Sequence, residues 1–236
     1  MKKLFLLLCL SLGINQLFAQ KVNWGVKAGL NSSTIVHPRQ SQTAAGVNNM
    51  TDHRITGYHV GIFSDIAFKN FSVQPALIYT TKGGSYENNS IYYTPSGIFP
   101  VYITNKTTLN YLEMPVNVLY NIPFSKGKLF IGGGPYAAIG LSGKYDNTGQ
   151  LTYNNGSSPT TTTSSGQGNI VFGSNPGDYR LLDLGLGLLG GISFKNGLLF
   201  SVNYSMGLSN ITRSTSVTTK NNLLGFSVGY YLTKSK

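Results

Sequence analysis

LLFSVNYSMGL occupies residues 198–208, and its apolar and polar side chains alternate along the stretch. Successive side chains of a β-strand point to opposite faces, so one face of this segment is apolar while the other carries small and polar side chains. The apolar face holds Leu198, Phe200, Val202, Tyr204, Met206 and Leu208. A strand with one face suited to lipid and the other suited to water is typical of a transmembrane β-barrel.

Other stretches of the chain share this alternation, and the links between them are short and long in turn. The predicted strands are Val22–Thr34, Arg54–Phe68, Phe71–Thr81, Thr108–Asn121, Lys128–Ser142, Tyr179–Phe194, Leu198–Ser209 and Lys220–Leu232. The long links are Ile35–His53, Lys82–Thr107, Gly143–Asp178 and Asn210–Thr219. This order predicts an all-β fold: an eight-stranded antiparallel up-and-down transmembrane β-barrel with periplasmic termini, short periplasmic turns and long extracellular loops.

The N-terminus has the features of a secretory signal. Lys2 and Lys3 precede the apolar run Leu4–Ile14, which is too short to span a membrane and suits the apolar part of a signal peptide. We therefore expect a signal peptide at residues 1–19 and one β-barrel domain at residues 20–236. Cys9 would leave with the signal, so the mature chain could form no disulfide. Export without a long apolar helix indicates the outer membrane of a two-membrane bacterium, or secretion.

Charged residues within the predicted strands test the barrel independently of hydrophobicity. Lys27, Asp65, Glu113 and Asp183 all fall on the polar parity of their strands, and His59 does too. A lysine or arginine facing lipid at mid-depth costs about 2 to 4 kcal/mol, which explains why the apolar faces carry no charge. We predict that these five residues form a lumenal polar network with a structural role, in which Lys27 pairs with Glu113 or Asp65.

Two further segments carry structural expectations. Pro75, Pro115 and Pro135 lie inside consecutive predicted strands, where each removes a backbone donor, so we expect β-bulges or locally broken pairing there. The longest predicted loop contains the run Ser157–Ser165, which is rich in serine and threonine. Its low apolar content predicts that the run has no regular structure.

The formal net charge is +11, and the lysines at the predicted short turns suit the anionic headgroups of outer-membrane lipids. Nucleic-acid binding would need a contiguous basic groove with stacking aromatic residues, whereas these cations are isolated at turns. The charge pattern therefore predicts lipid as a partner and excludes nucleic acid. The oligomeric state stays open.

Three short motifs carry a resemblance to a known family. They are GVKAGLN at Gly25–Asn31, YLEMP at Tyr111–Pro115 and DLGLG at Asp183–Gly187. Together they resemble the PorT-like, porin-family outer-membrane β-barrel domain over essentially the whole mature chain. The resemblance implies an eight-stranded outer-membrane barrel with no defined activity for most members. One branch of the family is associated with a dedicated protein secretion system, so it also implies envelope or secretion proteins as partners.

An enzyme would need a catalytic group, and the histidines are the residues to inspect. His37 and His53 lie in the first predicted loop, and Asp52 beside His53 makes the nearest acid–base pair. No serine is tied to them by a motif and no metal-ligand spacing is present, so we expect no catalysis, no metal and no cofactor.

Eight strands leave an interior that side chains can fill, so we expect a mostly filled, narrow lumen with no general pore and a role carried by the outer loops. The main alternative is a secreted or surface binding barrel that holds a small apolar ligand inside. A lipid-modifying membrane enzyme is a less favoured alternative.

Overall fold

The computed structural model describes residues 21–37, 46–94, 97–154, 159–213 and 218–233. The expected signal peptide, residues 1–19, lies outside the described residues. No helix in the described part of the chain is long and apolar enough to cross a membrane.

The described chain is built from antiparallel β-strands, which confirms the predicted all-β class. The strands are β1 (Lys21–Val36), β2 (Gly46–His53), β3 (Ile55–Phe68), β4 (Phe71–Thr94), β5 (Gly97–Phe124), β6 (Gly127–Asn154), β7 (Pro159–Ile170), β8 (Leu182–Phe194), β9 (Leu198–Gly207) and β10 (Lys220–Tyr231). Each predicted strand coincides with one of these, while β2 and β7 were not predicted.

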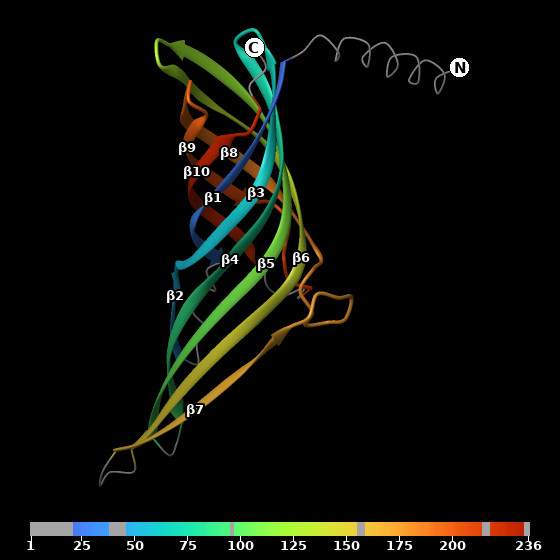
Figure 1. Ribbon diagram of the computed structural model, residues 1–236. Helices are drawn as coiled ribbons and strands as arrows, with labels where there is room; N and C mark the ends of the chain where they lie inside the picture. The colour runs from blue at the N-terminus through green and yellow to red at the C-terminus, as the bar shows by residue number, and fades with distance from the viewer. Residues whose placement is uncertain (1–20, 38–45, 95–96, 155–158, 214–217, 234–236) are drawn as a thin grey trace.

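The strand pairings return to their starting point. β1 pairs with β3 on one side and with β10 on the other, and the path runs on through β4, β5, β6, β8 and β9. β2 pairs with the far part of β4, and β7 pairs with the far part of β6. Figure 1 shows the ring with the first and last described residues at one end and the long hairpins of β4, β5, β6 and β7 extending from the other.

Alternation along the strands sorts side chains between the two faces of this ring. Along β8, Leu182, Leu184, Leu186 and Leu188 are exposed, whereas Asp183 between them is fully buried. Other strands expose apolar side chains in the same way, among them Trp24, Val26, Leu30, Val60, Ile62, Val116, Val118, Ile131, Phe200, Val202, Phe226 and Val228. Soluble monomers rarely expose a contiguous apolar surface of this kind.

Exposed aromatic side chains lie toward both ends of the apolar surface. Near the short turns, the rings of Phe71 and Tyr120 lie 5.2 Å apart in edge-to-face contact. Toward the long hairpins, Tyr58 and Tyr79 form a neighbouring pair with ring centroids 6.0 Å apart. Aromatic rows at two levels are characteristic of strands that cross a membrane.

The predicted long loops are largely strand, which corrects the boundaries drawn from hydrophobicity. β4 and β5 continue through the predicted loop Lys82–Thr107, and β6 runs to Asn154. The run Ser157–Ser165 was expected to lack regular structure, but its described part belongs to β7 and pairs with β6. Threonine is β-branched and favours extended backbone, so this polar run can add to an existing strand without an apolar face.

The prolines interrupt pairing as predicted. β3 and β4 pair at Phe63↔Ala76 and again at Ile66↔Val73, so pairing is broken beside Pro75. β4 and β5 skip the positions next to Pro115, and β5 and β6 skip those next to Pro135. The register resumes unchanged in all three cases, and the register shift along β5 and β6 lies elsewhere, between Asn110 and Tyr111.

Candidate functional site

The five residues predicted for a lumenal network are all buried inside the ring. Their exposed fractions are 7% for Lys27, 5% for His59, 1% for Asp65, 7% for Glu113 and 0% for Asp183. They do not form one network. Four of them divide among three levels along the ring axis, which we describe from the long hairpins toward the short turns.

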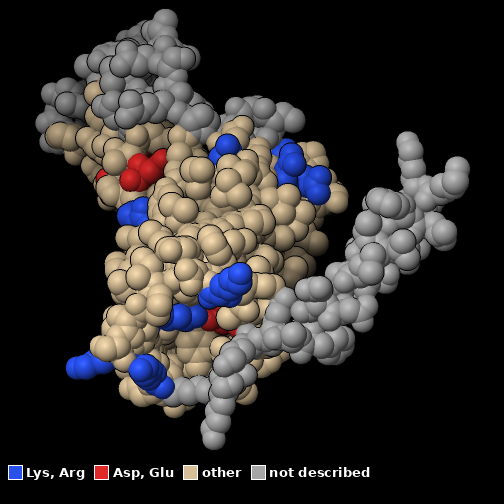
Figure 2. All heavy atoms as spheres, turned by 90° about the horizontal axis from the view of Figure 1, so that it is seen from above, with Lys and Arg blue, Asp and Glu red and all other residues tan. Residues whose placement is uncertain are grey.

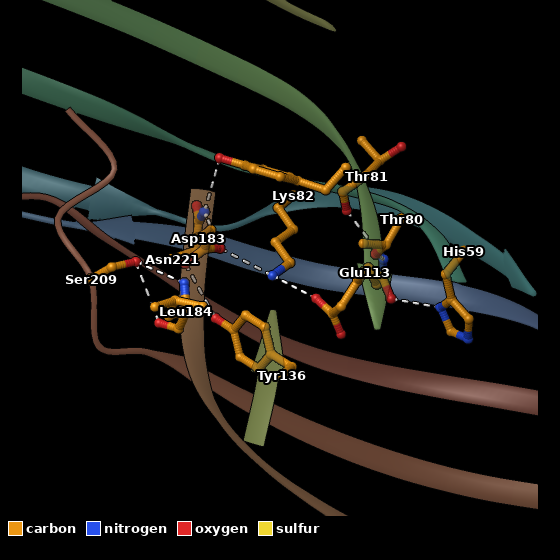
Figure 3. Close-up of polar contacts among 12 residues, drawn as sticks. His59, Thr80, Thr81, Lys82, Glu113, Tyr136, Asp183, Leu184, Ser209 and Asn221 are labelled. Carbon is orange, nitrogen blue, oxygen red and sulfur yellow. Dashed lines mark hydrogen bonds and ion pairs between the residues drawn. The ribbon is translucent and has the colours of Figure 1, made fainter. Parts of the chain in front are cut away.

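Lys82 is the centre of the first level, which we call the Lys82 cluster (Figure 3). Its Nζ lies 2.7 Å from Glu113 Oε2 and 3.2 Å from Asp183 Oδ2. The same ammonium lies 4.2 Å from the centre of the Tyr136 ring. Asn221 donates a hydrogen bond of 3.0 Å to Asp183 Oδ2. A single cation thus joins carboxylates from β5 and β8 across the ring.

This arrangement corrects the predicted pairing of Lys27. Glu113 pairs with Lys82, which was assigned to a predicted loop, and Asp65 pairs with Lys128, the first residue of a predicted strand. Among the described residues Lys27 forms no ion pair, and its Nζ lies 6.0 Å from the centre of the Phe63 ring. Lys82 was not predicted to lie inside the ring, because the predicted strand Phe71–Thr81 ends where the apolar face stops.

The second level is a chain of uncharged polar groups around His59. Its Nδ1 lies 2.7 Å from Asn31 Oδ1, and its Nε2 lies 2.8 Å from Ser227 Oγ. Asn31 in turn donates to Thr80 Oγ1 at 2.9 Å and to the Thr81 carbonyl oxygen at 3.1 Å. Both ring nitrogens therefore have partners, and the chain links β1, β3, β4 and β10.

The third level lies near the short turns. Lys128 Nζ is 2.6 Å from Asp65 Oδ2, and the Tyr231 hydroxyl donates to the same oxygen at 3.0 Å. Figure 2 views the molecule from this end, where lysine and arginine side chains lie around the rim. Lysines at the short turns themselves include Lys69, Lys126 and Lys195.

Apolar side chains separate the polar levels. One buried cluster contains Phe63, Leu119, Phe130, Leu189 and Leu199 and packs between Asp65 and His59 along the strands. A second buried cluster, which we call the outer apolar cluster, lies beyond His59 toward the long hairpins. Its members are Ile35, Leu109, Tyr111, Tyr136, Ala138 and Ile211.

The space left at mid-depth is small. A cavity of about 40 Å³ lies beside Lys27, His59 and Glu113. Since one water occupies about 10 to 15 Å³ on this measure, the cavity holds only a few waters. The contacts from Asp65 to the outer apolar cluster therefore leave little free space inside the ring at this level.

No group of three or more His, Cys, Asp or Glu side chains suited to holding a metal ion is found within the described ranges. His37 and Asp52, which lie near one another, form a pair with Nδ1 2.8 Å from Oδ1. His53 lies 3.7 Å from Glu87 rather than pairing with the adjacent Asp52.

A family match agrees with this architecture. Residues 18–213 match the family described as the outer membrane protein beta-barrel domain. Among solved structures, the chain is similar to Neisserial surface protein A, with 14% identity, a TM-score of 0.34 and coverage of 89% of this chain and 98% of that chain. No curated protein sequence matches the chain.

Two further solved structures are similar in the same way. Ail of Yersinia pestis is 9% identical, with a TM-score of 0.36 and coverage of 89% of this chain and 99% of its own. The translocator domain of the autotransporter NalP from Neisseria meningitidis is 13% identical, with a TM-score of 0.27 and coverage of 92% and 91%. Because the family match extends over most of the sequence, the chain belongs to the outer membrane protein beta-barrel domain family and is a protein of the outer membrane.

Proposed function

We propose that the ring is an eight-stranded transmembrane barrel, formed by residues 20–236 after a signal peptide at residues 1–19. The exposed apolar residues of β1, β3, β8, β9 and β10 would face lipid, with the aromatic rows at its two boundaries. The termini and short turns would lie in the periplasm, where Lys69, Lys126 and Lys195 suit anionic lipid headgroups. The extensions of β4, β5, β6 and β7 would then project from the cell.

The packed interior is the observation that supports this proposal about the protein's role. Lys82 is 1% exposed and holds two carboxylates across the lumen, and the outer apolar cluster packs beside it. A solute would have to break these contacts to pass. We infer a non-catalytic surface protein whose barrel anchors the projecting extensions and whose interactions take place on them.

The alternative of a barrel that holds an apolar ligand inside requires apolar side chains within and polar ones outside. The faces have the opposite arrangement, since Asp183 is buried while Leu182 and Leu184 beside it are exposed. The mid-depth cavity, at about 40 Å³, is also far below the ~300 to 1,000 Å³ of small-molecule pockets. Both observations argue against this alternative.

The enzymatic alternative has one observation in its favour. Ser227, His59 and Asn31 follow each other at hydrogen-bond distance, in the order nucleophile, base and orienting group. However, Ser227 and His59 are each 5% exposed and face a closed interior. A fluorophosphonate probe should therefore leave the folded protein unlabelled, whereas labelling abolished by Ser227→Ala would establish the enzyme.

The PorT-like resemblance supports a more specific proposal, which is a link to protein secretion. Envelope or secretion proteins would be the partners, with contacts at the periplasmic turns or on the extensions. Crosslinking in intact cells, followed by purification from detergent-solubilised membranes, tests it. Recovery of secretion-machine subunits, reduced when the lysines of the short turns are changed to glutamine, is the expected result.

Planar bilayer recordings test the closed barrel. Pure, folded protein should give no stable conductance, with rare small openings at most. Channels of nanosiemens size would contradict the proposal, because open aqueous channels belong to barrels of about 16 strands. Fractionation provides the companion measurement: the protein should stay with the outer membrane through a carbonate wash, whereas release into the soluble fraction would contradict a transmembrane barrel.

A further inference from the structure

The strand extensions enclose an open cavity of about 440 Å³ beyond the outer apolar cluster. We call it the outer cup and define it by six of its lining residues: Tyr86, Asn105, Thr107, Tyr145, Asn147 and Tyr179. Ile35 belongs both to the cup lining and to the outer apolar cluster, so that cluster forms the floor of the cup. The outer apolar cluster therefore bounds the cup on its inner side.

The chemistry of the cup lining is uncharged. No lysine, arginine, aspartate or glutamate is among the residues that line it. His37 also lines the cup, but its Nδ1 is held 2.8 Å from Asp52 Oδ1, so any positive charge on the ring is compensated. A charged ligand would lose its hydration on entering the cup and would find no partner of opposite charge there, which is unfavourable.

Aromatic rings form part of the walls and are held in place. The His37 and Tyr86 rings lie 5.2 Å apart in edge-to-face contact. Tyr179 packs against Phe172 with ring centroids 6.3 Å apart. Burial raises the pKa of Tyr86 and of Tyr179, so both phenols stay protonated at neutral pH and can donate hydrogen bonds. Within the described chain, no hydrogen bond engages the Tyr86 or Tyr145 hydroxyl.

Side-chain amides complete the wall between β5 and β6. Asn105 donates to Asn147 Oδ1, and Thr107 donates to Asn105 Oδ1 at 3.1 Å. A side-chain amide offers two donors and an acceptor with two lone pairs, so each asparagine keeps capacity for further hydrogen bonds. These internal contacts fix the amides in position before any ligand arrives, which lowers the entropy cost of binding.

We infer that the outer cup binds an uncharged carbohydrate from outside the cell. Sugars present C–H groups that pack on aromatic faces and hydroxyls that pair with amides and phenols, and they need no ionic partner. The cup volume lies within the ~300 to 1,000 Å³ range of small-molecule sites. The inference rests on the proposed function in one respect, since the extensions must project from the cell for the cup to meet extracellular glycans.

A glycan array tests the inference with full-length protein in detergent or nanodiscs. The probes are immobilised glycans with uncharged hexose or N-acetylhexosamine ends, with sialylated and sulfated glycans as charged counterparts. We expect binding to uncharged ends and at least a tenfold loss of affinity in Tyr145→Ala and in Asn147→Ala. Tyr102→Ala is the matched control, because Tyr102 lies on the extension of β5 and is 49% exposed on the opposite face.

Each variant is first checked for its shift on a denaturing gel before and after boiling, so that only folded protein is compared. Absence of glycan binding by folded wild type, binding to charged glycans alone, or equal affinity in all variants would overturn the inference. Bilayer recordings on the same preparation separate it from the proposed function. A conducting protein that binds uncharged glycans would refute the closed lumen only, and a silent protein that binds none would refute the cup only.

Discussion

Lys82 Nζ lies 2.7 Å from Glu113 Oε2 and joins β4 to β5 inside the ring, while Asp183 on β8 holds the same ammonium from the other side at 3.2 Å. The lysine is 1% exposed, and the Tyr136 and Tyr111 rings flank its charge. A buried cation with two carboxylates and two aromatic faces is well compensated. The cluster thus stabilises the ring at the level where the extensions begin.

Lys82→Met should lower the free energy of unfolding by about 3 to 5 kcal/mol, because it leaves two buried carboxylates without their cation. The measurement is the urea midpoint of protein refolded in detergent. Unfolding is monitored by tryptophan fluorescence and by the gel shift on boiling. Lys106→Met serves as the control, since Lys106 is exposed on β5 and its removal should change stability by less than about 0.5 kcal/mol. Similar midpoints for the two variants would argue against the cluster.

Lys27→Met should behave in the opposite way. Lys27 is 7% exposed and pairs with no carboxylate in the described part of the chain, so methionine removes a desolvated charge without leaving a carboxylate unpaired. We expect the urea midpoint to stay the same or to rise, by a free-energy change within about 1 kcal/mol. A loss as large as that of Lys82→Met would mean that Lys27 holds an acid in solution.

The contrast between these lysines shows what the sequence could predict. Alternation located every strand of the ring, because one face of each strand is apolar and exposed while the other faces the interior. The same parity predicted that Asp65, Glu113 and Asp183 face inward, and all three are buried. Lys82 has the same parity as the buried residues Ile78 and Thr80. It was not predicted to face inward because the predicted strand stopped where the apolar face ended.

The extensions of β4, β5, β6 and β7 were not predicted, for the same physical reason. Beyond the apolar band, both faces of a strand meet water or polar groups, so hydrophobic alternation disappears while backbone pairing continues. The partners Asn88↔Ile103 and Tyr102↔Gln150 are examples of such pairs. The outer cup depends on these pairs, and no sequence pattern in Lys82–Thr107 indicated them. Pairing across a ring also depends on register, which alternation alone does not determine.

Gly29→Ala should destabilise the barrel because an added methyl has no room. A Cβ at Gly29 would meet the Phe226 carbonyl oxygen and would lie 2.7 Å from the His59 ring. Overpacking of this kind costs about 1 to 3 kcal/mol, which the urea midpoint would report. Gly190→Ala is the matched control, since the nearest atom to its added Cβ lies 3.8 Å away on the outer face. Equal midpoints would show that the ring can widen at Gly29.

Shortening the β4–β5 hairpin should show that the ring folds without its extensions. Replacing Asn89–Tyr102 by Asn-Gly joins the paired residues Asn88 and Ile103 through a two-residue turn and leaves the Lys82 cluster intact. This variant should show the gel shift on boiling and a urea midpoint close to that of the wild type. A deeper replacement that joins Thr80 to Tyr111, which are also partners, removes Lys82 and should reduce the folded fraction strongly. If the first deletion also failed to fold, the extensions would be part of the folding unit rather than an addition to it, and equal folding of both variants would show that the ring does not need its buried cation.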